Sequence, residues 1–125
     1  MRQHEEAEQI AIMNWAEWKM AEHPDLYWLF HIPNGGHRNK ATAARLKAAG
    51  VKRGVPDLCL PKPRGGYHGL YIELKADSKG RPTPDQKKWL EQLAAAGYRA
   101  VLCHGYDEAV SEILAYILEK KGTGI

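Results

Sequence analysis

The sequence predicts a mixed α/β domain in which helices flank a central β-sheet, in the order α-β-α-β-β-α-β-α. Segments with apolar residues at helical spacing alternate with short apolar segments, and turns rich in proline and glycine separate them. The chain has 125 residues, 44% of them hydrophobic, which suits one domain around one core. We therefore expect residues 1–125 to form a single domain whose last residues, 121–125, are a frayed tail.

The first half of the chain predicts a helix, a strand and a second helix. Residues 3–22 carry apolar side chains at helical spacing and stop before a proline. Residues 26–32 are aromatic and apolar and predict a strand, which the turn at residues 33–36 ends. A helix is predicted to begin at about Asn39 and to stop at Gly50. Its exposed side carries Lys40, Arg45 and Lys47.

A hairpin is predicted next. Residues 57–60 form its first strand, residues 61–66 have turn chemistry, and residues 67–75 form its second strand. Because side chains alternate along a strand, the second strand has an apolar face and a polar face. The apolar face carries Leu70, Ile72 and Leu74, and the polar face carries Tyr71, Glu73 and Lys75.

The last third of the chain predicts a helix, a strand and a final helix. Thr83-Pro84-Asp85-Gln86 is a capping box with proline at the first helical position, and Gly97 closes the helix that it opens. Residues 98–103 predict a short strand, and residues 107–121 predict the final helix.

The composition gives no sign of a membrane or secreted protein. No apolar run approaches the about 18 residues of a membrane helix, and the first residues are too polar for a secretory signal. We expect a cytosolic (cytoplasmic) location in the cell that makes the protein, the host cytosol if a phage encodes it. Cys59 and Cys103 lie in apolar runs without metal-ligand spacing, so we expect two reduced cysteines on buried strands.

Histidines and tryptophans show no pattern of a metal or base-stacking site. We interpret the histidines as surface or packing residues and expect the tryptophans in the core. They are His31, His37, His68 and His104, and Trp15, Trp18, Trp28 and Trp89.

Basic residues concentrate in the middle of the chain. The net charge of +3 is small, but Asp57 is the single acidic residue between Leu26 and Ile72. Such a distribution is the footprint expected for a polyanion partner, with a solvated helix face and a charged hairpin tip as the alternative. The basic residues are Arg38, Lys40, Arg45, Lys47, Lys52, Arg53, Lys62 and Arg64.

Two acidic residues and a lysine converge in the predicted hairpin. Alternation places Glu73 and Lys75 on one face, about 7 Å apart along the chain. Pairing of the two strands brings Asp57 towards Glu73. A charged outer face of an edge strand is the alternative for Glu73 and Lys75 alone. The joint pattern, Pro56-Asp57 before an apolar strand and then Ile72-Glu73-Leu74-Lys75, favours a functional site.

These residue types suit phosphodiester hydrolysis. Two adjacent carboxylates repel each other unless a proton or a cation intervenes. Hard divalent cations such as Mg²⁺ take one or two carboxylates together with substrate phosphate, and the backbone carbonyl of Leu74 could supply a third oxygen. The ion would polarise a phosphate oxygen and lower the pKa of a bound water from about 15.7 toward about 7. Lys75 could orient or deprotonate that water and stabilise the developing negative charge.

Two motifs of the sequence, together with their surroundings, resemble those of a known family. Gly54-Val55-Pro56-Asp57 and Ile72-Glu73-Leu74-Lys75 look like the PD-(D/E)xK nuclease motif, and their surroundings resemble its virus-type replication-repair nuclease (VRR-NUC) branch. That branch includes stand-alone phage and bacterial proteins and the nuclease domain of the Fanconi-associated nuclease. The resemblance runs from about Glu5 to about Tyr106. Its other motifs are Ile32-Pro33-Asn34-Gly35-Gly36-His37-Arg38, Gly50-Val51-Lys52-Arg53, Gly69-Leu70-Tyr71 and Thr83-Pro84-Asp85-Gln86.

The resemblance implies a restriction-endonuclease-like fold with a metal site in the hairpin. Asp57 and Glu73 would be metal ligands, and Lys75 would be the catalytic lysine. Gln86 resembles a family glutamine near the active site, and its role in the capping box explains it equally well.

The resemblance also implies an acid on the first helix and a loop after the first strand. The acid would be Glu5 or Glu8, and the sequence leaves this open, with Glu6 elsewhere on the helical wheel as the third choice. All three could instead be acids that the helix dipole favours in a first turn. Asn34 and Arg38 resemble residues of the family's loop, with Arg38 the better phosphate candidate and a plain strand-to-helix turn as the alternative for its glycines.

The sequence thus predicts a Mg²⁺- or Mn²⁺-dependent endonuclease that acts on DNA. Resemblance to compact junction-resolving enzymes implies cleavage of branched DNA, such as four-way (Holliday) junctions, by a homodimer. The alternatives are a nuclease on flap, single-stranded or nicked DNA, a catalytically silent DNA-binding module, and an interaction protein with an acidic partner. We expect no membrane association and no nucleotide cofactor. The predicted DNA-binding residues are Asn34, Arg38, Lys40, Arg45, Lys52, Arg53, Lys62 and Arg64.

Overall fold

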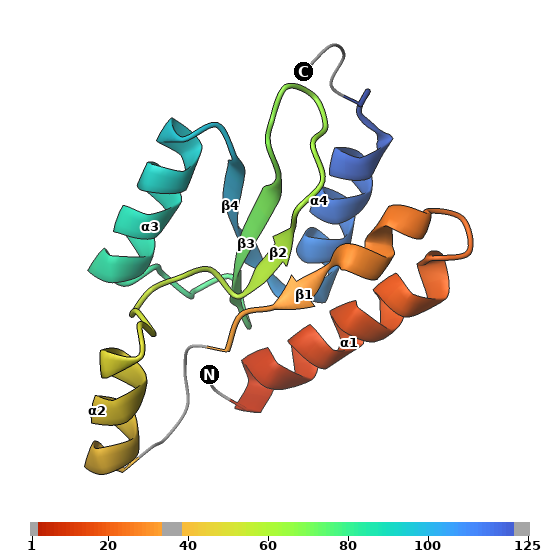
Figure 1. Cartoon of the computed structure of the whole chain (residues 1–125). Coiled ribbons are helices and arrows are strands. Elements are labelled where there is room, and N and C mark those ends of the chain that lie inside the picture. The colour runs from red at the N-terminus through yellow and green to blue at the C-terminus, as the bar shows by residue number, and fades with distance from the viewer. Residues whose placement is uncertain (1–2, 34–38, 122–125) are drawn as a thin grey trace.

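A computed structural model describes residues 3–33 and 39–121, and within them four strands form one mixed sheet in the order β1-β2-β3-β4 (Figure 1). β2 is antiparallel to both of its neighbours, whereas β3 and β4 are parallel. Parallel neighbours need a crossover connection, and a helix, α3, provides it. The strands are Phe30–His31 (β1), Leu58–Leu60 (β2), Leu70–Lys75 (β3) and Arg99–His104 (β4).

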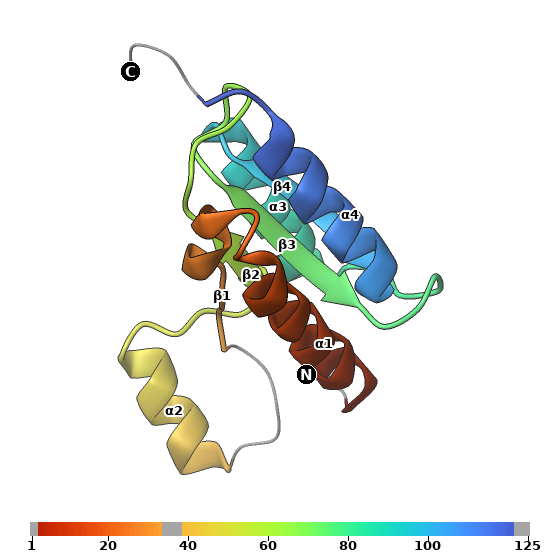
Figure 2. The same cartoon turned by 90° about the vertical axis from the view of Figure 1, so that its right-hand side faces the viewer.

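Helices cover both faces of the sheet. α1 and α4 pack against each other over one face, and α3 lies beside β4 on the opposite face (Figures 1 and 2). The layers and the order of elements confirm the predicted mixed α/β fold. None of the helices that the structure describes is long and apolar enough to cross a membrane. They are Gln3–Lys19 (α1), Lys40–Ala48 (α2), Pro84–Ala95 (α3), Gly105–Leu118 (α4) and the short 3-10 helix Pro24–Trp28 (η1).

The hydrophobic core lies between the sheet and the α1–α4 layer. Leu70, Ile72 and Leu74, alternate residues of β3, are each at most 1% exposed. Ile12 of α1 and Ile113 of α4 belong to the same cluster and are fully buried. Burial of each such side chain contributes roughly 1.5–3 kcal/mol. The predicted alternation of β3 is therefore confirmed, and its other face is left to carry polar groups.

The predicted strand over residues 26–32 is largely wrong. Pro24–Trp28 form the 3-10 helix η1, and only Phe30–His31 pair with β2. Proline at the first helical position presets the φ angle of a helical turn, which the apolar composition of the run does not reveal. The expectation of tryptophans in the core also fails for Trp18 on α1 and Trp28 on η1, which are 71% and 50% exposed.

The other predicted elements are present with shifted ends. β2 begins one residue after Asp57, and β3 begins at Leu70 rather than at residue 67. β4 extends to His104, and α4 begins directly after it at Gly105. Gly105 has a φ of +85°, a value that lets the chain turn from strand to helix without the loop that the sequence suggested.

Helix α2 projects away from the sheet and its covering helices (Figures 1 and 2). Asn39 caps it, since its side-chain oxygen accepts a hydrogen bond from the Thr42 N–H at 2.7 Å. None of the residues Lys40–Ala48 is buried. Most of its apolar side chains are alanines, which offer little area for docking. Packing against the hydrophobic core therefore does not hold α2 in its position.

Both cysteines are free and buried, as predicted. Burial raises the pKa of the Cys103 thiol to about 12 and also raises the pKa of the Cys59 thiol. Both side chains therefore stay protonated and act as small apolar groups in the sheet.

Candidate active site

The candidate site begins at the end of the β2–β3 pair where Asp57 enters β2. Leu58 pairs with Ile72, and one further step of this antiparallel register places Asp57 opposite Glu73. Opposite residues in such a pair have Cβ atoms about 5 Å apart. The Leu74 N–H donates to Asp57 Oδ2 at 2.7 Å and fixes the carboxylate at this position. The structure thus brings the two carboxylates together, as the sequence predicted.

Glu73 is a buried acid with one oxygen unpaired. Its residue is 2% exposed. Oε2 accepts from Gln86 Nε2 at 3.0 Å and lies 3.8 Å from Lys75 Nζ. Within the described part of the chain, Oε1 has no hydrogen-bond partner. A buried polar atom without a partner is costly, so this oxygen indicates a missing ligand.

Burial and mutual repulsion oppose ionisation of both acids. Burial first, and then the charge of Asp57, raise the pKa of Glu73 from its usual 4.5 to about 9. Burial also raises the pKa of Asp57, against the opposing effect of the Leu74 N–H. Without a cation, the pair therefore retains a proton at neutral pH.

Lys75 and Gln86 complete the cluster from β3 and from the start of α3. Lys75 Nζ donates to Gln86 Oε1 at 2.9 Å. The same oxygen accepts from the Thr83 N–H at 2.9 Å, and Thr83 Oγ1 accepts from the Gln86 N–H at 3.2 Å. The predicted capping box is therefore confirmed, and the glutamine that forms it also bridges Lys75 and Glu73.

Asp57, Glu73 and Gln86 line one cleft with a volume of about 590 Å³, and Lys75 is joined to it through its hydrogen bond to Gln86. The segment before β2 and the first turn of α3 both contribute lining residues. The two segments are in close contact at Gly54, where a Cβ would lie 2.6 Å from the backbone carbon of Asp85. The lining residues are Glu5, Glu6, His31, Pro33, Arg53, Gly54, Val55, Asp57, Glu73, Thr83, Pro84, Asp85 and Gln86.

Comparison with known proteins assigns this fold and cleft to a family. The model of the VRR-NUC domain matches residues 3–107. The chain belongs to the VRR-NUC domain family. A solved structure described as a VRR_NUC domain protein is 37% identical to it; the match covers 100% of this chain and 97% of that one, with a TM-score of 0.84. No curated protein matches the chain.

Membership in the VRR-NUC family implies a nuclease of the PD-(D/E)xK type, with DNA as its substrate. VRR-NUC nucleases generally depend on a divalent metal ion. The residues that resemble the family motif lie in the cluster described above, with Asp57 ahead of β2 and both Glu73 and Lys75 on β3.

Of the acids on α1, Glu5 is the one that the structure brings to the cleft while leaving it partly buried. Its charge is also among the smaller causes that raise the pKa of Glu73, after burial and Asp57. Glu6 lines the same cleft but is exposed, so its expected place elsewhere on the helical wheel was wrong.

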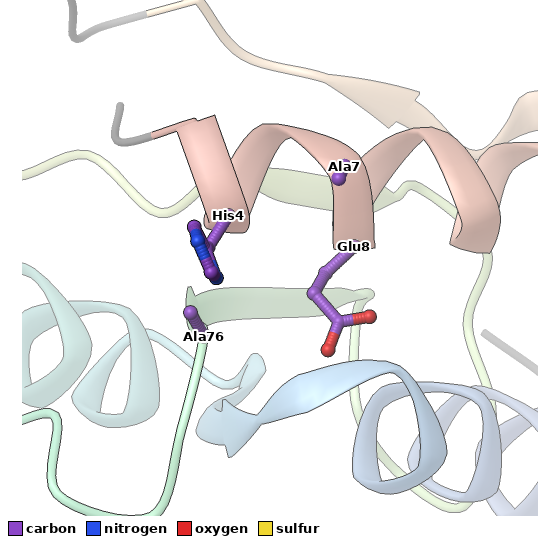
Figure 3. Close-up of a pocket in the computed structure, with 4 residues that line it drawn as sticks. All are labelled: His4, Ala7, Glu8 and Ala76. Carbon is purple, nitrogen blue, oxygen red and sulfur yellow. The ribbon is translucent and has the colours of Figure 1, made fainter.

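Glu8 points to a separate pocket of about 380 Å³, which His4, Ala7 and Ala76 complete (Figure 3). A Cβ on Gly105 would lie 3.5 Å from Glu8 Oε1, so this carboxylate sits near the first residue of α4. The positive end of a helix dipole stabilises an acid there. Of the two acids that the sequence left open, Glu5 lines the cleft with Asp57 and Glu73 and Glu8 does not, so Glu5 stays the predicted first-helix acid.

The donor groups at the cleft fit a hard divalent cation. Among the described residues, no three His, Cys, Asp or Glu side chains are arranged to hold a metal by themselves. Asp57 and Glu73 provide two carboxylates, one with a free buried oxygen. The N–H and C=O of a strand residue point to the same edge, so the Leu74 carbonyl faces the edge where Asp57 lies. Mg²⁺ is commonly held by one or two carboxylates, with water and substrate phosphate as its other ligands.

Four of the predicted DNA-binding residues are exposed on α2 or on the segment between α2 and β2. Lys40 and Arg45 are exposed on α2, and Lys52 is exposed on the segment that follows it. Arg53 lines the cleft itself. Within residues 3–33 and 39–121, none of these four side chains forms an ion pair. Their charges are thus available to a polyanion.

The other predicted DNA-binding residues are placed differently. Asn34 and Arg38 lie outside the described residues. Lys62 and Arg64 follow the far end of β2 and both pair with Asp25, and Arg64 is only 7% exposed. The sequence marked these two as a charged hairpin tip or a DNA contact; the structure uses them to join the hairpin to η1.

Sequence reasoning missed the role of His31 in the cleft. Its Nδ1 lies 2.9 Å from the Asp57 backbone oxygen, which also accepts from the Ile32 N–H at 2.8 Å. A carbonyl oxygen only accepts, so Nδ1 carries the proton. His31 thereby fixes the backbone that presents Asp57. Its place two residues before the Pro33-Asn34-Gly35-Gly36 turn gave no such signal.

Proposed function

We propose that the protein is an endonuclease that hydrolyses phosphodiester bonds of DNA with Mg²⁺ or Mn²⁺ as its cofactor. One observation carries this proposal: Asp57 and Glu73 face each other in a buried site, and one Glu73 oxygen has no partner within the described residues. An ammonium group, that of Lys75, lies 3.8 Å from the same carboxylate. A cation relieves the repulsion of the two acids and satisfies the free oxygen.

Asp57, Glu73 and the Leu74 carbonyl would hold the ion, with Glu5 the next acid along the cleft. When bound, the ion supplies Lewis-acid polarisation of a phosphate oxygen and a lowered pKa for the attacking water. The protein's own contribution is to present two carboxylates in a fixed position, through the Leu74 N–H on one and the Gln86 amide on the other.

Lys75 and Gln86 would act on the substrate side of the cluster. Lys75 orients the attacking water and stabilises the negative charge that develops on the phosphate. Gln86 holds the ammonium of Lys75 and the carboxylate of Glu73 in one network. Because Lys75 is only 13% exposed at its side chain, its ammonium is directed inward rather than to bulk water.

The DNA backbone would approach over α2. Lys40, Arg45 and Lys52 would contact phosphates, and Arg53 would guide the strand into the cleft. Exposure, a shared sign of charge and the absence of ion pairs among the described residues support this path.

We further propose that the substrate is branched DNA, such as a four-way junction, and that two copies act together. Two clefts related by a two-fold axis cut two strands symmetrically. Support comes from four exposed aromatic side chains, Trp18, Tyr27, Trp28 and Phe30, each at least 45% exposed, of which Tyr27 and Trp28 are in ring contact. Exposed apolar groups of this size are found at protein–protein interfaces.

Cleavage of a panel of labelled substrates tests this proposal. Four-way junction, flap, nicked, duplex and single-stranded DNA are incubated with Mg²⁺, Mn²⁺ or EDTA. We expect symmetric cuts in the junction with either ion and none with EDTA. Sedimentation gives the mass in solution, for which we expect that of a dimer.

Controls separate the competing functions. Lys75→Ala should bind junction DNA as tightly as the wild type and leave it uncut. Preferred cutting of flap, nicked or single-stranded DNA would replace the junction proposal but keep the enzyme. Binding of every DNA without cutting, in both metals, would establish a silent DNA-binding module instead.

A further inference from the structure

Gly80 packs against the aliphatic stem of Lys75. A Cβ added to Gly80 would lie 2.7 Å from Lys75 Cβ, 2.9 Å from Cγ and 3.2 Å from Cδ. These positions are closer than real carbon contacts, so a residue with a side chain would displace the lysine or the turn. The first two lysine atoms are near the backbone and cannot move aside freely.

Gly80 is itself fixed by two independent sets of hydrogen bonds. Asp77 Oδ1 accepts from the Lys79 N–H at 2.9 Å and from the Gly80 N–H at 3.1 Å, which closes the turn after β3. On the other side, the Gly80 carbonyl lies 2.9 Å from His104 Nε2. Because a carbonyl oxygen only accepts, Nε2 carries the proton and donates.

His104 is anchored in turn at the junction of β4 and α4. It is the register partner of Lys75 in the parallel β3–β4 pair. Its backbone N–H donates to Glu108 Oε1 at 2.9 Å, and its Nδ1 lies 3.6 Å from the same oxygen. The start of α4 therefore sets the position of the imidazole, and the imidazole sets the position of Gly80.

We propose that Gly80 and His104 are positioning residues that hold the Lys75 side chain in its reactive orientation. The inference rests on the proposed nuclease function, since it assigns the lysine a reaction to perform. The lysine stem lies against Gly80, and its ammonium is held by Gln86 at 2.9 Å. A lysine has four rotatable bonds, and restraint at both ends removes most of that freedom before the substrate arrives.

The proposal predicts a loss in turnover rather than in DNA binding. A displacement of about 1 Å of a catalytic group lowers the rate by up to about 100-fold. We therefore expect Gly80→Ala to lower kcat about 10- to 100-fold and His104→Leu about 10-fold, both with little change in KM. His104→Gln should restore the rate, because its amide can donate where Nε2 does.

The experiment combines single-turnover cleavage of junction DNA with a chemical measurement on the metal-free protein. Acetylation of lysines by N-hydroxysuccinimide acetate, followed by peptide mass spectrometry, reports how accessible each ammonium is. Lys75 should react slowly in the wild type and faster in Gly80→Ala and His104→Leu. Lys79, which is exposed one residue before Gly80, serves as the internal reference.

Gly66→Ala is the control for a glycine-to-alanine change away from Lys75. Gly66 has a φ of +87° and no neighbour within 4 Å of a built Cβ, and it lies in the connection between β2 and β3. Its substitution adds backbone strain, which Gly80→Ala does not, but no contact with Lys75, so kcat per folded molecule and Lys75 acetylation should stay at wild-type values.

Wild-type kcat and acetylation in Gly80→Ala would overturn the proposal. So would a loss of activity that follows only the unfolded fraction, as measured by circular dichroism. If Gly80→Ala fails to fold, the His104→Leu and His104→Gln pair decides. If the wild type cuts no DNA in either metal, the nuclease function fails, and the acetylation rates alone still decide whether these residues restrain Lys75.

Discussion

Both ends of the β2–β3 pair carry clustered charges. The two clusters differ in whether their acidic groups are neutralised by basic residues of the protein. At the hairpin end, Asp25 lies between Arg64 and Lys62, and the Arg64 guanidinium also donates to the backbone oxygens of Pro63 and Ile117. At the cleft end, two acids face each other across the strands. One end is neutralised by its own residues and the other is left in need of a cation.

The pKa values of the acids record this difference. The Arg64 hydrogen bond holds the pKa of Asp25 below its usual value, whereas burial and Asp57 raise that of Glu73 to about 9. Charges that are already paired stabilise a fold. Charges that are buried and unpaired cost stability and are retained where chemistry needs them.

The largest effect should come from Asp57→Asn. This change keeps the size of the side chain and an oxygen for the Leu74 N–H but removes one charge from the ion site. Loss of several kcal/mol of transition-state stabilisation corresponds to a fall in kcat of about 1000-fold. Single-turnover cleavage in Mg²⁺ measures it. A variant with more than a tenth of wild-type activity would show that the cleft end does not hold the ion.

Arg64→Met tests the opposite end. It removes the charge but keeps a long apolar stem, and it leaves Asp25 half paired. We expect a loss of about 1–2 kcal/mol in the free energy of unfolding, because the buried Arg64 loses its hydrogen bonds to the partly exposed Asp25 and to two backbone oxygens. Urea unfolding measures this. Cleavage per folded molecule should be unchanged, and a specific fall in kcat would mean that the hairpin end also serves the reaction.

The stability of the metal-free protein should fall as the pH rises from about 5 to about 9. In this window the unfolded chain releases the Glu73 proton near its usual pKa of 4.5, while the folded chain keeps it until its pKa of about 9. Fewer protons on the unfolded state make the slope negative. Glu73→Gln should flatten this slope, and thermal unfolding across the pH range would reveal it.

At low pH, Asp25 changes the stability in the opposite direction, so that stability rises with pH. Its pKa is lowered by Arg64, so its contribution is full above about 3.8 and is lost as the pH falls through its folded value. Arg64→Met should reduce the loss of stability below pH 4 and leave the window between 5 and 9 unchanged. If Arg64→Met changed the pH dependence of stability only between pH 5 and 9, the assignment of the low-pH effect to Asp25 and of the higher-pH effect to Glu73 would be wrong.

The smallest effect should come from α2. Lys40→Gln and Arg45→Gln change exposed residues, so unfolding should be unaffected. We expect each to weaken DNA binding a few-fold and to reduce the slope of log K against log salt by about 1. Binding titrations at several salt concentrations, in Ca²⁺ or EDTA, measure this. Unchanged slopes would remove α2 from the DNA path.

Local signals in the sequence predicted much of the fold and the centre of the site. The capping box at Thr83 and Gln86 fixes the start of α3, and alternation in β3 assigns Glu73 and Lys75 to one face. Proline before Asp57 marks the entry into β2. Each of these rests on neighbours within a few residues, where physical rules are strongest.

The remainder depends on contacts that are distant along the chain. Arg64 and Asp25 are 39 residues apart, and the sequence gives no sign that the hairpin tip reaches η1. The choice between Glu5 and Glu8 depends on how α1 crosses the sheet. The helical pattern of α2 in the sequence does not reveal that none of its residues is buried.

Gln86 belongs to the first turn of α3 and to the cleft at the same time. Its Oε1 accepts from the Thr83 N–H and from Lys75 Nζ, and its Nε2 donates to Glu73. Binding of an ion or a phosphate that displaces Lys75 or Glu73 from Gln86 therefore also destabilises the first turn of α3. By thermodynamic reciprocity, fraying of this turn weakens binding of the ion. The rate of amide hydrogen exchange at Gln86 and Lys87 therefore reports whether the cleft is occupied by an ion or a phosphate, and the measurement needs no label on the nucleic acid.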